Sequence, residues 1–263
     1  MALGLAEEPL PINVWIDAQM SIHARTEDGG HWGSVATVAA GVDYLITDDF
    51  LAGIMVQGDW SKDQTDISLL SGGGYLVGPY VSIALSEDIS FDAVVLYGGS
   101  SDTANARILG EDFTGNFEST RLYAKAALTG QFDIGALTVR PNMTFFLGSE
   151  HSGGYTVSNG RGDVVSVAGT DFLQYRVTVG GRVEYAIPME DGAMLTPLVG
   201  LDLGFTGADI AGGDQTQALI GTLTLGAEYQ SINGFKLGGK VAGEIGSDGF
   251  TAARASATIS GSF

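Results

Sequence analysis

The sequence predicts an all-β protein, a transmembrane antiparallel β-barrel of about twelve up-and-down strands. Three observations lead to this prediction. Apolar and polar residues alternate along almost the whole chain, in segments of about ten residues, the length a tilted strand needs to cross a bilayer. Charged residues collect on one parity of these segments. The connections between segments are short or long in alternation.

The first segment, PINVWIDAQMSIHAR at residues 11–25, sets the pattern. Every second residue from Val14 to Ala24 is apolar, and polar residues such as Asp17 stand between them. Trp15 is the one large apolar residue on the polar parity. Because successive side chains of a strand point to opposite faces, the segment has one apolar face and one polar face.

The same alternation continues to the end of the chain. Soluble strands average about 5–6 residues, so segments of about ten residues favour a membrane crossing. The predicted strands occupy residues 11–25, 36–46, 51–60, 74–85, 89–99, 117–129, 136–148, 172–186, 193–206, 217–229, 235–246 and 251–263.

The predicted connections fall into two classes. Short turns read ITDDF, SEDI, QFDIG, PMEDG and QSING. Longer loops read RTEDGGHWG, SKDQTDISLLSGG, SSDTANARILGEDFTG, SEHSGGYTVSNGRGDVVSVAGTD and GADIAGGDQ, and the last hairpin, SDG, is short. Outer-membrane barrels have short periplasmic turns and longer extracellular loops. An even number of strands would return both ends of the barrel to the short-turn side.

The charged residues indicate which face meets which medium. Eight of the twelve basic residues fall on the polar parity, together with eight acidic residues, and the apolar parity carries essentially no charge within the strands. A sheet in lipid must close, because open edges leave amides unpaired. We therefore predict lipid outside and a wet, charged lumen inside. The predicted luminal residues are Asp17, Asp43, Asp59, Asp92, Arg121, Lys125, Arg140, Arg176, Arg182, Glu184, Asp202, Glu228, Lys236, Lys240, Glu244 and Arg254.

Parity alone does not separate this barrel from a soluble β-sandwich adhesin, whose charges would meet water and whose apolar faces would form the interior. Strand length, repetition and loop asymmetry favour the barrel. A glycine on the polar parity, such as Gly41 or Gly53, is expected to let the backbone or a large luminal neighbour approach closely.

Composition excludes several other functions. The net charge of −19 excludes nucleic acid as a partner, because such binding requires a basic surface that displaces counterions. The absence of cysteine excludes disulfides and thiolate metal sites. No apolar run reaches the ~18 residues of a transmembrane helix. MALGLAEEPLP lacks the basic start and apolar stretch of a signal peptide, so an exported form of the protein would be represented here by a mature fragment or by an engineered chain with its own Met1.

The span from about Leu10 to Phe263 resembles the β-domain of autotransporters, the translocator half of type V secretion proteins. The strand NVWIDAQMSIHA has a tryptophan early in its alternation, and GVDYLITDDFLAGIMVQGDWS resembles the second hairpin of those barrels. The chain ends on Phe263 after ARASATISGS, similar to the signal that the barrel-assembly machinery reads. Ala, Ile and Gly stand there where that family usually has larger residues.

The resemblance implies an N-terminal passenger domain, joined to this chain by a helix that threads the pore. A helix across a ~30 Å layer needs ~20 residues, so residues 1–11 would be a remnant of the linker and residues 12–263 the barrel. Some members cleave themselves at an Asn within that helix, but no Asn precedes Asn13 here, so self-cleavage is not carried over. The residues expected to contact the linker are chiefly Arg121, Arg140, Arg176, Arg182 and Arg254.

The resemblance also implies a monomer in the outer membrane of a Gram-negative bacterium. Its partners would be outer-membrane lipids, lipopolysaccharide, the barrel-assembly machinery and the passenger, without nucleic acid. It implies no catalytic residue, metal or cofactor. A stand-alone porin or outer-membrane channel remains an alternative, because it would have the same charged lumen.

Three further patterns have functional interpretations that we rank lower. An outer-membrane lipid hydrolase would need a His–Ser pair oriented by an acid or amide; His23 is on luminal parity, whereas His31 and His151 lie in predicted loops. The RGD at residues 161–163 is more simply a chance tripeptide of a Gly- and Asp-rich loop than an integrin ligand. The acidic loops match no calcium-loop spacing. The luminal charges themselves favour a structural ion-pair lattice over an active site.

Overall fold

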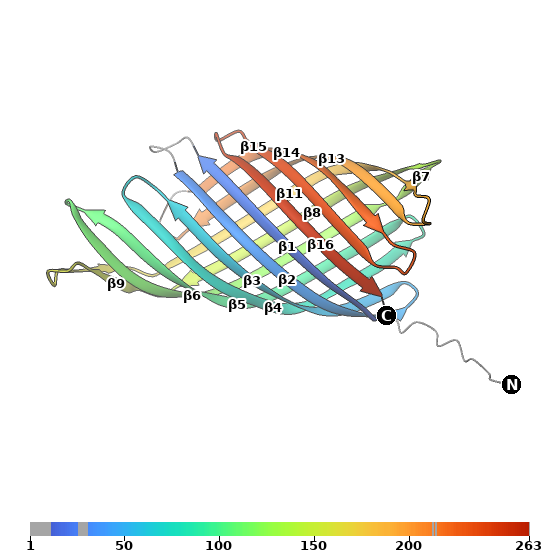
Figure 1. The fold of residues 1–263 in the computed structure, drawn as a ribbon. Helices are drawn as coiled ribbons and strands as arrows, with labels where there is room; N and C mark the ends of the chain where they lie inside the picture. Colours follow the sequence, from blue (N-terminus) through green and yellow to red (C-terminus); the bar gives the residue numbers. More distant parts are fainter. Residues whose placement is uncertain (1–11, 26–30, 212, 214, 263) are drawn as a thin grey trace.

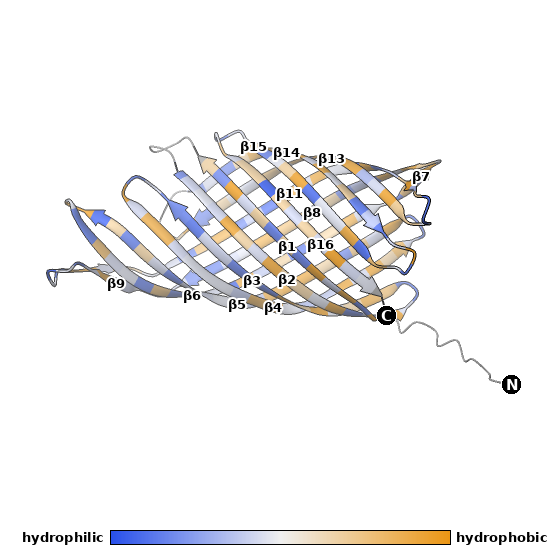
Figure 2. Ribbon diagram, in the orientation of Figure 1, coloured by the Kyte–Doolittle hydropathy of each residue, from blue (hydrophilic) through white to orange (hydrophobic). Residues whose placement is uncertain are grey.

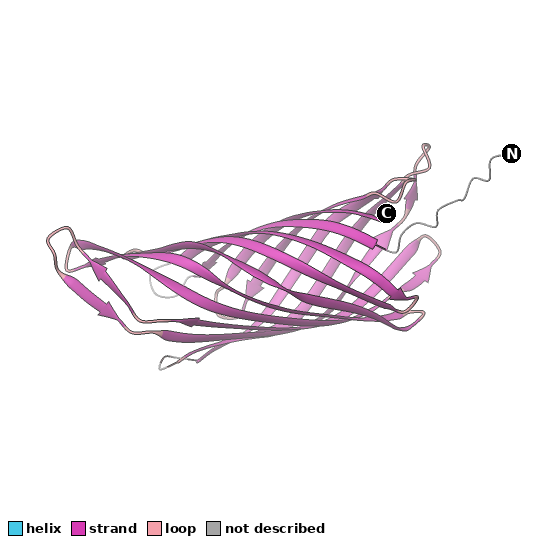
Figure 3. Ribbon diagram, turned by 90° about the horizontal axis from the view of Figure 1, so that it is seen from below, coloured by secondary structure: helices cyan, strands magenta, loops and turns pink. Residues whose placement is uncertain are grey.

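The structure, a computed structural model, is a closed antiparallel β-barrel (Figure 1). It describes residues 12–25, 31–211, 213 and 215–262. The described part of the chain contains strands, turns and loops, with the connections at the two ends of the wall (Figure 3). The predicted strands and short turns therefore form one continuous wall. Among these residues we find no helix of the length and hydropathy needed to span a membrane.

Twelve long strands form the wall within the described residues, which confirms the predicted fold class and strand count. They are β1 (Ile12–Arg25), β2 (His31–Thr47), β3 (Phe50–Gln64), β4 (Ser68–Ser86), β5 (Ile89–Ile108), β6 (Glu111–Gly130), β8 (Leu137–Ser152), β11 (Thr170–Tyr185), β13 (Met194–Ile210), β14 (Gln215–Gln230), β15 (Lys236–Gly246) and β16 (Thr251–Ser262). Four short strands accompany them, namely β7 (Phe132–Ile134), β9 (Tyr155–Ser158), β10 (Val164–Val167) and β12 (Ile187–Pro188).

The barrel closes between its first and last strands. β1 pairs antiparallel with β16 from Asn13↔Ser262 to Ala24↔Thr251. Every other long strand pairs with its neighbours along the chain, and β6 pairs directly with β8 from Ser119↔Ser152 to Thr129↔Asn142. The backbone donors and acceptors of the long strands are therefore satisfied on both sides, as lipid requires.

The structure contains short turns where the sequence predicts them. β2 and β3 pair up to Thr47↔Phe50, and β4 and β5 pair up to Ser86↔Ile89, so two-residue turns join them. The start of β1 and the end of β16 lie at this same end of the barrel, because Asn13 pairs with both Asp43 and Ser262. Both ends of the described chain therefore lie on the short-turn side.

The prediction of long loops is partly wrong, because β-strands extend over much of the length assigned to these loops. β5 and β6 run to Ile108 and Glu111 and are joined only by Leu109 and Gly110, which have φ values of 52° and 85°. Two positive φ values in a two-residue connection are typical of a type I′ hairpin turn. The longest predicted loop, 149–171, contains the β9–β10 hairpin. Outside the bilayer both faces of a strand can meet water, so pairing continues after the alternation has ended.

The two faces of the wall have the polarity predicted from parity. Apolar side chains on the outer face are exposed, for example Ile54 at 63%, Leu219 at 67% and Ile245 at 68%. Charged residues on the inner face are buried, for example Asp59 and Arg121. Figure 2 shows the hydrophobic and hydrophilic residues in alternation along the strands. A soluble sandwich would have the opposite distribution, so the structure rejects that alternative.

Candidate functional site: the charged lumen

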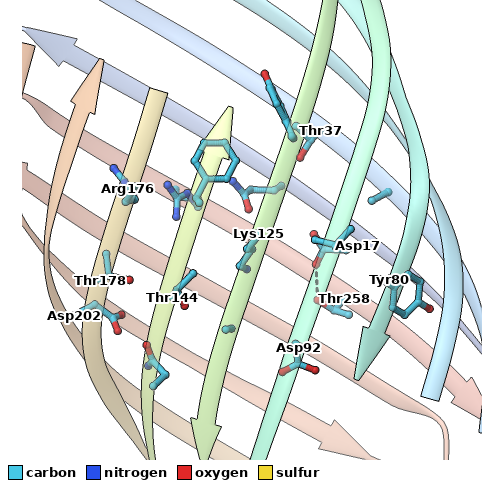
Figure 4. Close-up of a pocket in the computed structure, with 18 of the residues that line it drawn as sticks. Asp17, Thr37, Tyr80, Asp92, Lys125, Thr144, Arg176, Thr178, Asp202 and Thr258 are labelled. Carbon is cyan, nitrogen blue, oxygen red and sulfur yellow. Dashed lines mark hydrogen bonds between the residues drawn. The ribbon is translucent and has the colours of Figure 1, made fainter. Parts of the chain in front are cut away.

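The interior of the barrel contains a cavity of about 1170 Å³ that touches most of the long strands (Figure 4). Polar and charged side chains make up much of its lining. Nine of the sixteen predicted luminal residues line this cavity: Asp17, Asp92, Lys125, Arg140, Arg176, Arg182, Asp202, Glu244 and Arg254. The others lie beside it on the same face, and several of them form the ion pairs described next.

Arg121 and Asp59 form a buried ion pair on the inner face of the wall, and two strands lie between them. Arg121 on β6 donates from Nη1 and Nη2 to the two carboxylate oxygens of Asp59 on β3, both at 2.9 Å. Nη2 also donates to the carbonyl of Gly99 on β5 at 3.1 Å. A side chain at Gly74 on β4 would occupy the position of this guanidinium. Glycine is therefore required beneath the bridge, and a bidentate pair this buried is a strong, geometrically fixed contact.

A second group of ion pairs links β8 to β11. Arg140 Nε donates to one carboxylate oxygen of Glu184 at 2.9 Å, and Arg182 Nε donates to the other at 2.6 Å. The carboxylate thus lies between two guanidinium groups. The group has one more positive than negative charge and faces the cavity.

A third group joins β11, β14, β15 and β16. Arg176 donates to both carboxylate oxygens of Glu244, at 2.5 and 3.1 Å, and Thr222 donates to the same carboxylate at 3.0 Å. Arg254 lines the cavity nearby, and its buried Nε has no hydrogen-bond partner among the described residues. The ion pairs that we expected as a lattice are therefore present in three separate groups rather than as one continuous network.

A chain of hydrogen bonds runs along the inner face from β1 to β4. Trp15 Nε1 donates to the Tyr80 hydroxyl at 2.7 Å, and that hydroxyl donates to Asp43, which also accepts from Asn13 at 3.3 Å. Tyr80 is not among the luminal residues predicted from the sequence. One feature of the sequence could have identified it. Trp15 is a large residue on the polar parity, and glycines stand opposite both Trp15 and Tyr80.

Asp17 forms a hydrogen bond between β1 and β16, the two strands at which the barrel closes. It accepts a hydrogen bond from Thr258 on β16 at 2.6 Å, between residues 241 positions apart in sequence (Figure 4). Because this contact links the first and last strands, it can form only in the closed barrel.

The remaining predicted luminal residues have weaker contacts. Glu228 lies 3.9 Å from Lys236, and both side chains are half exposed. Lys240 pairs in register with Ser256, which in turn pairs with the cavity residue Gln19. Phe263 and residues 1–11 lie outside the described residues, so the assembly signal and the linker remnant stay predictions.

Comparison with known proteins decides the family. The family model described as the autotransporter β-domain matches residues 19–206. The chain belongs to the autotransporter β-domain family. This confirms the resemblance inferred from the sequence. No match was found among curated protein sequences.

Solved structures of autotransporter β-domains have the same fold. The β-domain of the Bordetella autotransporter BrkA matches with a TM-score of 0.79 at 16% identity, over 96% of this chain and 100% of that one. The translocator domain of NalP from Neisseria meningitidis matches with a TM-score of 0.70 at 14% identity, over 99% and 91%. The transport unit of AIDA-I from Escherichia coli has a TM-score of 0.54 at 15% identity, over 100% and 93%. At these identities the likeness concerns the fold alone.

The described geometry of His151 and Ser152 in this β-domain is not that of a nucleophile and its base. His151 Nδ1 bonds to Asp171 at 2.5 Å, whereas the Ser152 hydroxyl donates to the Thr170 carbonyl at 3.3 Å. His31 begins β2, and the ring of His23 stacks on Phe250 with centroids 5.9 Å apart. A hydrolase needs a base that contacts the nucleophile, and the described His151–Ser152 pair does not meet this condition. Autotransporter β-domains are transport barrels, which is consistent with this geometry.

The RGD tripeptide of the β-domain lies at the turn between β9 and β10. Arg161 contacts Glu111 at 2.8 Å, and Gly162 has a φ of 93°. Asp163 accepts from the Asn159 side chain at 2.8 Å. Both charged side chains of the tripeptide therefore contact their own hairpin or its neighbour.

Proposed function

We propose that this β-domain is the outer-membrane translocator of an autotransporter, which anchors an N-terminal passenger and helps to export it to the surface of a Gram-negative cell. In this proposal the lumen holds the linker helix, and the domain works as a monomer without a cofactor. Outer-membrane lipids, lipopolysaccharide and the barrel-assembly machinery are its other partners.

The observation that supports the proposal is the position of the start of β1. Ile12 pairs with Tyr44, close to the two-residue turn between β2 and β3, so the first strand begins at the short-turn end. Short turns face the periplasm in barrels of this type. A passenger on the cell surface must then be joined to β1 by a segment that runs the length of the lumen. Twelve strands about 4.8 Å apart and tilted by about 40° enclose a ring about 24 Å across between backbones, and a helix with its side chains is about 10–12 Å across.

A surface-display experiment tests the proposal. The gene that encodes this barrel is expressed with an epitope tag in the region upstream of residue 1, in whole cells that are then treated with protease. The tag is expected at the surface and sensitive to protease. The matched control deletes the last hairpin, β15 and β16, so that the barrel cannot close. Retention of the tag at the surface in that control, or its absence with the intact barrel, would contradict the translocator function.

The cavity itself favours a second candidate, a stand-alone channel. Planar-bilayer conductance separates the two. A translocator is expected to conduct weakly with its linker segment in place and strongly without it, because a helix excludes water from most of the lumen. Equal conductance with and without the upstream segment would favour the channel.

A further inference from the structure

The first five strands present a wall of carboxylates to the lumen. The acidic wall consists of Asp17, Asp43, Asp59, Asp92 and Asp102; Asp17 and Asp92 line the cavity, and the other three are buried on the inner face. No described Lys or Arg side chain on these strands shares that face. Lys62 lies on the outer face, 5.5 Å from the ring of Trp32, and Arg107 is exposed at the tip of β5.

The other strands present a wall in which bases outnumber acids. The basic wall is formed by Arg121, Lys125, Arg140, Arg176, Arg182 and Arg254, joined by the two lysines of β15, Lys236 and Lys240. Five acids share this face: Glu150, Glu184, Asp202, Glu228 and Glu244. Apart from the turns and hairpin tips, the basic wall therefore has an excess of three positive charges. Counted in the same way, without residues at the strand ends such as Arg25 and Asp63, the acidic wall opposite has five negative charges and no base among the described side chains.

Most of the acidic wall is not neutralised by the ion pairs of the inner face. Asp59 is the member that has a basic partner within 4.0 Å among the described residues. Asp17 contacts Thr258, Asp43 contacts Tyr80 and Asn13, and Asp102 accepts from Ser100 at 2.6 Å. On the basic wall, Lys125, Lys240 and Arg254 form no ion pair within that distance in the described part of the chain. Unbalanced charge of opposite sign therefore remains on the two walls.

We propose that the lumen binds a polypeptide helix whose basic residues lie along one face and whose acidic residues lie along the opposite face. The acidic wall receives the basic face and the basic wall receives the acidic face. Charges across an aqueous gap are screened within about 8 Å at physiological salt, but a lumen with low-dielectric walls focuses their field. An occupant about 10–12 Å wide brings its charges within that range of both walls. That this occupant is the linker rests on the proposed function.

The charge pattern gives a sequence rule for the occupant. Residues of one sign should recur at spacings of three, four and seven, which share a helix face. Residues of the other sign should be displaced by half a turn. A helix that carried the same charges without this separation would place like charges against each wall.

Blockade of single barrels by synthetic peptides tests the inference. The barrel, residues 1–263, is placed in a planar bilayer with one of two helical 20-residue peptides. One peptide has Lys along one face and Glu along the opposite face, and the other has the same composition with the charges distributed around the helix. We expect the separated peptide to block for about tenfold longer, which corresponds to about 1.4 kcal/mol.

Substitutions in the barrel complete the test. The double variant Asp17→Asn with Asp92→Asn should reduce the tenfold preference to about twofold or less. The matched control Asp48→Asn with Asp88→Asn removes the same charge from the short turns and should keep the preference. Heat-modifiable gel migration shows that both variants fold. Equal blockade by the two peptides, or a preference that survives in the lumen variant, would overturn the inference. Because no passenger is present, this result is independent of the surface-display experiment that tests the translocator function.

Discussion

Trp15 on β1 donates a hydrogen bond of 2.7 Å to the hydroxyl of Tyr80 on β4, across the two strands that lie between them. The two rings meet edge to face with centroids 5.9 Å apart. Glycines on the intervening strands make this possible. A side-chain carbon at Gly41 would lie 2.5 Å from the Trp15 ring, and one at Gly53 would lie 2.5 Å from the Tyr80 ring. The approach that we expected at these two glycines is therefore present.

Substitution of these glycines should slow barrel assembly. We expect Gly41→Val or Gly53→Val to displace Trp15 or Tyr80 and to destabilise the barrel by about 1–3 kcal/mol, as overpacking does in cores. The rate at which the heat-modifiable folded form appears in detergent or lipid should fall several-fold. Gly239→Val is the matched control, because a side chain there meets no atom within 4 Å. Normal assembly of the Gly41 and Gly53 variants would show that the rings do not require glycine beneath them.

The Arg121–Asp59 pair should be important for stability because both side chains are buried, at 8% and 7% exposure. Asp59→Asn leaves the guanidinium without its charged partner, and loss of one member of a buried pair costs about 3–5 kcal/mol. Unfolding in urea, followed by heat-modifiable migration, should report this loss. The control pair is Arg107 and Asp112, which are exposed and 3.9 Å apart. Asp112→Asn should change stability by about 1 kcal/mol or less. Similar effects at the two sites would contradict the assignment of Arg121–Asp59 as a stabilising bridge.

The sequence could predict the strands and the two faces because a strand in a membrane must alternate strictly. It could also predict which charged residues share the lumen, since their parity decides this. It could not predict that Arg121 on β6 bonds to Asp59 on β3, because that contact depends on strand tilt, on the absence of a side chain at Gly74 and on the backbone carbonyl of Gly99. The ends of β4 and β5 were missed for another reason. The Gly- and Ser-rich segments 71–74 and 98–101 do not alternate, yet their backbones are paired.

The hairpin that carries the RGD tripeptide should become more sensitive to protease when its anchor is removed. Arg161 contacts Glu111 at 2.8 Å, which holds the β9–β10 turn against the tip of β6. We expect Glu111→Gln to increase the rate of trypsin cleavage after Arg161 several-fold, because a protease requires a locally mobile chain. Mass spectrometry of the fragments locates the cut. Glu118→Gln, on the same strand, is the control that leaves this contact intact. An unchanged rate in the Glu111 variant would mean that the contact does not restrain the turn.

Spin labels should distinguish the lipid-facing and luminal sides of one strand. The chain has no cysteine, so single Val199→Cys and Asp202→Cys variants on β13 can be labelled without background. Val199 is 46% exposed on the outer face, whereas Asp202 lines the cavity. In lipid vesicles we expect the label at 199 to be relaxed mainly by oxygen, which concentrates in acyl chains, and the label at 202 mainly by a water-soluble nickel chelate. Ile232→Cys, in a turn with 72% exposure, provides the aqueous reference. If position 199 responded to nickel as strongly as position 232 does, the outer face would not lie in hydrocarbon, and the membrane orientation of the wall would be wrong.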